Sequence, residues 1–207
     1  MTKKIQGLYA ITNEQMIAPK KFTSRVRQAL EGGAKVIQYR NKSQHHELRL
    51  EQAESVVALC AEFGALSIIN DDIELCKLTN SDGLHIGSDD DDVVYARSEL
   101  GPEKIIGVSC YSSVDLANQA IAASADYVAF GSVFASSTKP EAPVANLDVL
   151  RKAKRELNVP IVAIGGINLN NVSQVIATGV DSVAIISGVF ASDDVNVAAH
   201  SFAKSFL

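Results

Sequence analysis

Short apolar runs alternate with longer segments of helical periodicity along the whole chain. Each run is rich in β-branched residues, which is typical of a buried strand. The segments between the runs repeat their apolar residues every three or four positions, which is typical of an amphipathic helix. Eight strands are predicted in this way, at residues 5–12, 34–39, 65–69, 82–86, 104–108, 126–130, 159–164 and 181–186.

The helical pattern is clearest in five of the connecting segments. Several of them end at a glycine, namely Gly32, Gly64 or Gly179. Glycine commonly caps the C-terminus of a helix, because it adopts a left-handed backbone conformation without strain. Helices are predicted at residues 22–30, 48–63, 114–123, 147–157 and 172–178.

The alternation predicts an α/β protein with one (β/α)8 TIM barrel, a single domain over residues 1–207. Eight strand–helix units without a linker fit the short end of the size range of this fold. An open, doubly wound sheet is the alternative, but it would need a glycine-rich turn after the first strand, where the chain has TNEQM at 12–16. In a barrel the loops after the strands meet at one mouth, so polar residues at the strand ends are the candidate site.

Composition and charge narrow the classes of function. The chain is 47% apolar and 21% charged, which is ordinary for a globular protein and excludes disorder. Its net charge of -5 argues against a general surface for nucleic acid or anionic membranes. The three cysteines have no CxxC spacing, and there is neither a signal segment nor a membrane-length apolar run. We therefore expect a soluble, cytoplasmic protein with buried thiols.

The second predicted strand ends in a basic sequence, from Gln38 through Tyr39, Arg40 and Asn41 to Lys42. Because side chains alternate along a strand, Gln38, Arg40 and Lys42 share one face. An arginine fork and a flexible lysine at a barrel mouth suit phosphate oxygens. The alternative is that the strand ends at Tyr39 and that both cations are solvated loop charges, and this pattern alone favours neither interpretation.

Acidic residues follow the next two predicted strands. The third strand ends in Asn70, Asp71 and Asp72, and the loop after the fourth contains four aspartates at 89–92. Carboxylates that face cations are what a Mg²⁺–diphosphate site needs. Aspartates before a helix also cap its N-terminus and are usually solvated, so we expect at most two of the four to contact a metal.

The loops after the last two predicted strands favour a phosphate pocket, and the loop before them favours a cover for the substrate. Gly165 and Gly166 follow the seventh strand, and Ser187 and Gly188 follow the eighth, where backbone N–H groups of this barrel type usually bind a phosphomonoester. The loop at 131–143 is the longest in the chain, and its hydroxyls and lysine could cover an anionic substrate.

These strand ends together imply two phosphorylated ligands, one of which is a metal-bound diphosphate. Substitution at carbon with loss of diphosphate is the natural reaction class. No histidine pair has the spacing of a metal site, and no GxSxG motif is present. The lack of an obvious general base suits a reaction whose main demand is electrostatic.

An ordered set of motifs resembles the thiamine phosphate synthase family over nearly the whole chain. The motifs are GLYAIT at 7–12, QYRNK at 38–42, INDD at 69–72, DGLHIG at 82–87 followed by Asp90, GVS at 107–109, DYV at 126–128 with Gly131, TK at 138–139, AIGGI at 163–167 and IS at 186–187. The resemblance implies an enzyme, a transferase that uses Mg²⁺. It would join 4-amino-2-methyl-5-hydroxymethylpyrimidine diphosphate to thiazole phosphate, or to its carboxylated tautomer. The products would be thiamine phosphate and diphosphate, formed by a dissociative mechanism.

The resemblance also implies a role for individual residues. It places Mg²⁺ on Asp71 and Asp90, and catalysis on Arg40, Lys42, Ser109 and Lys139. The residues implied around the pyrimidine diphosphate are Gln38, Tyr39, Arg40, Asn41, Lys42, Asn70, Ser109 and Lys139. Those implied around the thiazole phosphate are Ser136, Ser137, Thr138, Gly166, Ile186 and Ser187.

Two alternatives to a synthase stay open. A related thiazole tautomerase shares the phosphate pocket but typically has a histidine just after the fifth strand, where this chain has Cys110 and Tyr111. A barrel that senses thiamine intermediates without catalysis is the second. The chain departs from the usual family pattern at Ser88, Ser132, Ser136 and Ala145, which bears on loop closure and affinity. The expected partners are small-molecule substrates, with neither nucleic acid nor membrane, and a homo-oligomer is an open prediction.

Overall fold

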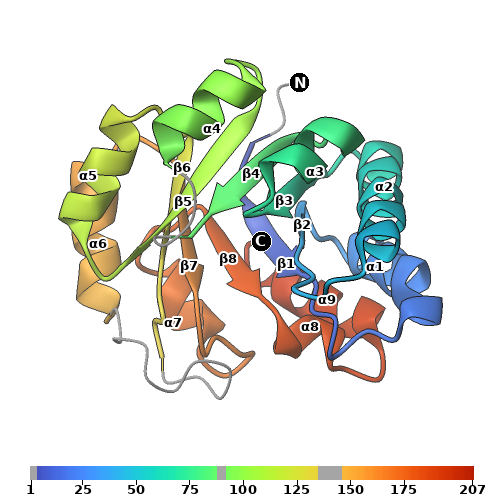
Figure 1. The fold of residues 1–207 in the computed structure, drawn as a ribbon. Helices are drawn as coiled ribbons and strands as arrows, with labels where there is room; N and C mark the ends of the chain where they lie inside the picture. The colour runs from blue at the N-terminus through green and yellow to red at the C-terminus, as the bar shows by residue number, and fades with distance from the viewer. Residues whose placement is uncertain (1–3, 88–91, 135–145) are drawn as a thin grey trace.

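The computed structural model is a closed barrel of parallel strands with helices around it (Figure 1). It describes residues 4–87, 92–134 and 146–207. Each strand pairs with the next one along the chain, and β8 closes the barrel against β1. The strands are β1 (Gly7–Ile11), β2 (Val36–Tyr39), β3 (Leu66–Asn70), β4 (Gly83–Ile86), β5 (Ile105–Tyr111), β6 (Tyr127–Phe130), β7 (Ile161–Ile164) and β8 (Ser182–Ile185).

Each strand is followed by at least one helix, and the helices cover the outside of the barrel (Figure 1). They are the 3-10 helix η1 (Pro19–Lys21) and the α-helices α1 (Phe22–Glu31), α2 (His46–Phe63), α3 (Ile73–Thr79), α4 (Val93–Leu100), α5 (Val114–Ala122), α6 (Leu147–Glu156), α7 (Val172–Ile176), α8 (Ser187–Phe190) and α9 (Val195–Lys204). Within the described ranges, none of them combines the length and the apolar character that crossing a membrane requires.

The predicted fold class is confirmed. All eight predicted strands are present, with ends that differ from the prediction by at most three residues. The five predicted helices are also present, as α1, α2, α5, α6 and α7. The helices α3, α4, α8 and α9 are not among these five. The first three have eight residues or fewer, and such short segments show little periodicity.

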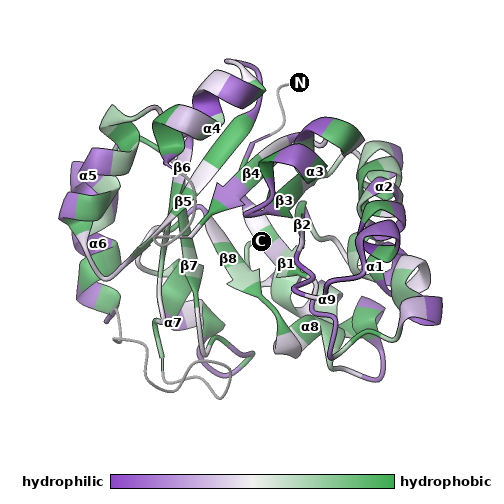
Figure 2. Ribbon diagram, in the orientation of Figure 1, coloured by the Kyte–Doolittle hydropathy of each residue, from purple (hydrophilic) through white to green (hydrophobic). Residues whose placement is uncertain are grey.

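Two apolar layers follow from the alternation of side chains along the strands. Tyr9 and Val36 belong to a cluster inside the barrel, and Ile37 and Tyr39 belong to the larger cluster between the strands and the helices. The helices complete that outer layer with one apolar face, so most of them carry both green and purple segments in Figure 2. The inner cluster leaves the mouth of the barrel to polar side chains.

Aspartates tie neighbouring strands together at the end of the barrel opposite the mouth. Asp82, Asp126 and Asp181 each stand just before an even-numbered strand. Each carboxylate accepts a hydrogen bond from a backbone N–H of the preceding odd-numbered strand, at distances of 2.7–2.8 Å. A charged acceptor strengthens such a hydrogen bond. These contacts therefore fix the register between neighbouring strands at their N-terminal ends.

Aspartates also begin two of the short helices. The carboxylate of Asp72 accepts from Leu75 N at the start of α3, and that of Asp92 accepts from Val94 N at the start of α4. A cap of this kind satisfies an N–H group that has no partner within the helix. Asp92 therefore has the capping role expected for part of the aspartate run at 89–92.

Replacement of Asp181 by alanine should destabilise the fold by about 1–3 kcal/mol, because the N–H of Ile161 loses its acceptor in a partly buried position. Urea unfolding measures the change. Glu51→Ala, at an exposed position on α2, is the control and should change the stability by no more than about 0.5 kcal/mol. Equal stability of the two variants would contradict the role given to Asp181.

Candidate active site

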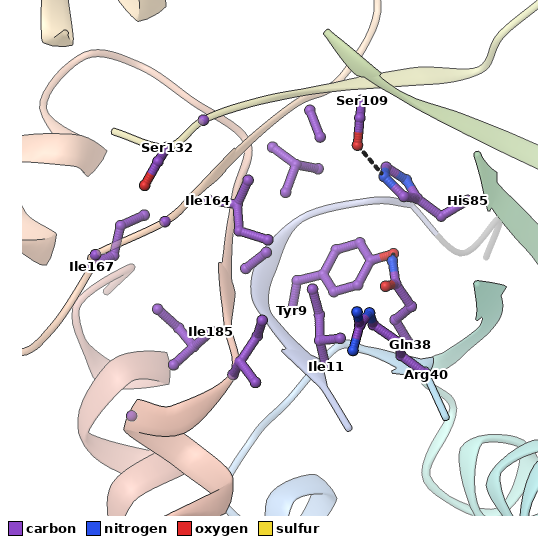
Figure 3. A pocket seen from close by; sticks show the side chains of 18 of the residues that line it. Tyr9, Ile11, Gln38, Arg40, His85, Ser109, Ser132, Ile164, Ile167 and Ile185 are labelled. Carbon is purple, nitrogen blue, oxygen red and sulfur yellow. Dashed lines mark hydrogen bonds between the residues drawn. The ribbon is translucent and has the colours of Figure 1, made fainter. Parts of the chain in front are cut away.

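A cavity of about 430 Å³ opens at the carboxyl ends of the strands, where the fold rule for barrels expects chemistry (Figure 3). Seven of the residues predicted for substrate binding line it. They are Gln38, Arg40, Asn70, Ser109, Gly166, Ile186 and Ser187. The structure thus brings together residues that come from five different strand ends.

Strand β2 ends at Tyr39, and the side chains of Gln38 and Arg40 line the cavity on either side of that end. Lys42 lies two residues further on, with its side chain about half exposed. Thr12 holds the backbone of Arg40 through two hydrogen bonds, since its hydroxyl accepts from Arg40 N at 2.9 Å and donates to Arg40 O at 3.2 Å. The end of β2 is therefore fixed by the end of β1.

Two predicted substrate residues have side chains that point away from the cavity. The hydroxyl of Tyr39 donates to Gln52 Oε1 at 3.0 Å, and its ring packs edge-on against Phe22. The side-chain amide of Asn41 donates to the same oxygen at 3.1 Å. Contacts from Tyr39 and Asn41 to a ligand in the cavity would therefore have to use their backbone groups.

Asp71 presents a carboxylate at the rim, between strands β3 and β4. Its backbone adopts the left-handed conformation, with φ of 62°, and its N–H donates to His85 O. Its Oδ2 accepts hydrogen bonds from Lys42 Nζ and Asn70 Nδ2, both at 2.5 Å. A left-handed aspartate at a strand end is an unusual conformation that turns the side chain toward its neighbours at the mouth.

The donor set around Asp71 fits a magnesium ion that is shared with a substrate. Carboxylate oxygen is the hard ligand that Mg²⁺ prefers, and such ions commonly use one or two carboxylates together with substrate phosphates. In the part of the chain that is described, no three histidine, cysteine, aspartate or glutamate side chains form a metal-binding group. A metal at Asp71 would therefore take its remaining ligands from a bound phosphate or from residues outside the described ranges.

Several predicted residues lie outside the described ranges. These are Asp90, Ser136, Ser137, Thr138 and Lys139, together with Ser88 and Ala145 among the departures from the family pattern. Their roles stay predictions.

The opposite side of the cavity is built from the turns after β7 and β8. Gly165 and Gly166 both have positive φ values, of 96° and 66°. Ser132 packs so closely on Gly165 that a Cβ there would lie 2.2 Å from Ser132 Oγ, so only glycine fits. Ser187 begins helix α8, whose first N–H groups have no preceding carbonyl to bind. This side offers backbone donors to an anion.

The sequence prediction did not include three buried aromatic residues of the cavity. Tyr9, His85 and Tyr127 line it, and hydrogen bonds of 2.9 Å join the hydroxyl of Tyr127 to that of Tyr9 and to His85 Nδ1. Burial lowers the pKa of His85 to about 4, although Asp71 opposes this effect, and it raises the pKa of both tyrosines. All three are neutral at pH 7. Their signal was present, because each stands on the inward face of a predicted strand.

The cavity therefore has a charged end, an end built from backbone N–H donors, and a neutral centre. Arg40, Lys42 and Asp71 lie at one end, and the glycine turn with the start of α8 lies at the other. Neutral aromatic and aliphatic side chains fill the wall between them. Such an arrangement can hold two anionic groups apart while their uncharged portions meet in a site with little water.

Comparison with known proteins gives one consistent result. The family model described as thiamine monophosphate synthase matches residues 8–189. The thiamine-phosphate synthase of Acidithiobacillus ferrooxidans is 45% identical over 205 residues, which cover 98% of this chain and 94% of the relative. The protein of the same name from Nitrosococcus oceani is 45% identical and covers 100% of this chain and 95% of the relative.

A solved structure indicates the same family as these relatives. The thiamine phosphate pyrophosphorylase from Pyrococcus furiosus superimposes with a TM-score of 0.89 at 36% identity, and the match covers 97% of this chain and 95% of that one. The chain therefore belongs to the thiamine monophosphate synthase family, which confirms the resemblance and, with it, the predicted class of enzyme, a transferase of thiamine biosynthesis.

Proposed function

We propose that this barrel, acting as one catalytic domain, joins the aminopyrimidine diphosphate to thiazole phosphate with Mg²⁺ and releases diphosphate. The observation that carries the proposal is that Arg40 and Asn70 line one cavity together with the Gly165–Gly166 turn and Ser187. Asn70 contacts Asp71, which pairs with Lys42. Two phosphorylated substrates need two separate anion sites, and these ends supply them. A cytoplasmic location and a homo-oligomer stay predictions, since neither follows from the cavity.

The basic end would bind the pyrimidine diphosphate. Arg40 is positioned to hold oxygens of the diphosphate in its planar fork, and Lys42 adds a second cation at the rim. Asp71, with Asp90 from outside the described ranges, would hold the Mg²⁺. When bound, that ion supplies positive charge that stabilises diphosphate as a leaving group. The bond from the methylene carbon to oxygen breaks, and its electron pair leaves with diphosphate.

The glycine-rich end would bind the phosphate of the thiazole. Backbone N–H groups there fix the phosphate without adding a cation, which leaves the thiazole nitrogen free to face the pyrimidine. That nitrogen donates its lone pair to the methylene carbon and forms the new carbon–nitrogen bond. The pyrimidine and thiazole would meet against the apolar wall, which includes Ile164 and Ile186. The exclusion of water there protects a cationic intermediate from hydrolysis.

The end of β5 bears on the tautomerase alternative. The tautomerase typically has a histidine after this strand, whereas here the strand continues through Cys110. That thiol is buried, and burial raises its pKa to about 12, so it cannot act as a base near neutral pH. Arg40 lines the cavity as a second-substrate site requires, which further favours the synthase.

The proposed reaction is tested by incubating the purified protein with both substrates and Mg²⁺, beside a sample with EDTA. We expect thiamine phosphate and diphosphate in equal amounts, and only in the presence of Mg²⁺. Tight binding of thiamine phosphate without turnover would instead identify a sensor. Isomerisation of the carboxylated thiazole, without a requirement for the pyrimidine, would identify a tautomerase.

Replacement of Asp71 by asparagine should lower kcat on the order of a hundredfold and raise the Mg²⁺ concentration needed for half-maximal activity, because a metal carboxylate ligand is lost. Steady-state kinetics at varied Mg²⁺ measures both changes. Asp72→Asn is the matched control, since an asparagine still accepts at the helix N-cap of α3. An unchanged Mg²⁺ dependence in the Asp71 variant would refute the metal assignment.

Substitutions at the two ends should separate the two substrates. Gly165→Ala pushes a methyl group against Ser132 and disturbs the phosphate turn, so KM for thiazole phosphate should rise on the order of tenfold. Arg40→Lys removes the planar fork, so the pyrimidine diphosphate should be the substrate affected. Kinetics with each substrate varied in turn checks this, with circular dichroism to confirm folding. The opposite pattern would exchange the two sites.

A further inference from the structure

A continuous line of hydrogen bonds joins Gln38 to Ser109 through the core of the barrel. It runs from Gln38 Nε2 to the Tyr9 hydroxyl at 2.8 Å and on to the Tyr127 hydroxyl at 2.9 Å. It continues from Tyr127 to His85 Nδ1 at 2.9 Å and from His85 Nε2 to Ser109 Oγ at 3.0 Å, the bond drawn in Figure 3. We call these five side chains the core relay.

The core relay is buried and held by ring packing. Tyr9, Gln38 and Tyr127 are at most 3% exposed. The rings of His85 and Tyr127 stack with centroids 5.6 Å apart, and the ring of Tyr127 occupies the space where Gly107 lacks a side chain. An unpaired donor or acceptor in such surroundings is costly, so every proton of the core relay must point at an acceptor.

Each middle member has two partners in the line, and a tyrosine hydroxyl or a neutral imidazole has one proton to donate. In the structure the amide nitrogen of Gln38 donates to Tyr9. Tyr9 must then donate to Tyr127, and Tyr127 to His85 Nδ1. The ring proton of His85 is therefore on Nε2, which donates to Ser109. The carbonyl of Gln38 is left as an acceptor for the cavity, and the hydroxyl of Ser109 is left to donate.

Rotation of the Gln38 amide by half a turn reverses every bond. Tyr9 then donates to Gln38, Tyr127 donates to Tyr9, His85 donates from Nδ1, and Ser109 donates to His85. No proton is gained or lost. Gln38 now presents its amide nitrogen to the cavity, and Ser109 presents only lone pairs. Any mixed arrangement leaves a buried proton without an acceptor or brings two lone pairs face to face, and both are costly in the core.

We propose that the core relay is a specificity device, in which Tyr9, Tyr127 and His85 are positioning residues that make the ligand-facing groups of Gln38 and Ser109 complementary. In the observed direction, the cavity accepts a hydrogen bond at Gln38 and donates one at Ser109. A ring with an exocyclic amino donor and a ring-nitrogen acceptor matches this pattern. A 4-oxo ring carries the opposite donor and acceptor pattern on its amide-like edge.

The inference deepens the proposed function and rests on it, since it concerns how the pyrimidine site selects an amino over an oxo ring. A network with only a structural role would weaken the binding of both rings equally when broken. A network that sets polarity would change the ratio of the two affinities. That ratio separates the two roles.

The test is calorimetric titration with the diphosphates of the 4-amino pyrimidine and of its 4-oxo counterpart, without thiazole phosphate. The wild type should favour the amino ring on the order of tenfold or more, the ratio that one unpaired buried polar group produces. In Tyr127→Phe the hydroxyl of Tyr9 keeps only Gln38 as a partner and donates to its carbonyl. The amide nitrogen then faces the cavity, so the preference should fall at least about tenfold.

Ser182→Ala is the matched control. It removes another buried hydroxyl, which donates to Gly7 O at 2.8 Å at the far end of the barrel, and it should keep the wild-type ratio. Equal losses for both rings in Tyr127→Phe would overturn the inference and leave the proposed function intact. Failure of the wild type to bind either diphosphate would overturn both.

A second measurement needs no variant to be stable. Nitrogen-15 NMR of histidine-labelled wild type distinguishes the protonated ring nitrogen from the bare one. With the amino ring bound, the signal of His85 should show the proton on Nε2. A proton on Nδ1 in that complex would overturn the direction assigned to the core relay.

Discussion

Closure of eight parallel strands is the constraint on which the rest of the structure depends. It brings every strand end to one mouth, and the alternation of side chains then decides which residues face the cavity. At the end of β2, Gln38 and Arg40 face the cavity and Tyr39 points outward to Gln52. The site is thus set by backbone geometry before any particular contact forms. Aspartates at the opposite end hold the register on which that geometry relies.

Charged side chains lie at one end of the cavity, backbone donors lie at the other, and the centre is neutral. At one end the carboxylate of Asp71 contacts Lys42 and Asn70, and at the other the phosphate donors are backbone groups. Between them, burial keeps His85 and the two tyrosines uncharged. A neutral, polar centre can orient an uncharged ring by hydrogen-bond direction alone. This separation of charged and neutral groups suits a reaction in which charge develops where diphosphate departs.

Much of this organisation could be predicted from the sequence. Short apolar runs predicted the strands correctly. The polar residues at the strand ends predicted Gln38, Arg40, Asn70 and Ser109 as site residues, and all four line the cavity. Tyr9, His85 and Tyr127 were not predicted as site residues, because they lie within strands, where aromatic residues are expected to pack in the core. Only the closed barrel shows that their polar atoms meet. Helices α3 and α8 were not predicted because they are too short to show a repeat of apolar residues. Helix α3 begins at the cap from Asp72.

The central claim is that one cavity holds two phosphorylated ligands at opposite ends. A crystal structure with thiamine phosphate, diphosphate and Mg²⁺ tests it most directly. The account predicts the diphosphate and metal beside Arg40 and Asp71, and the phosphate of the product on the turn at Gly166 and Ser187. Diphosphate on the glycine turn, or thiamine phosphate outside the cavity, would contradict it.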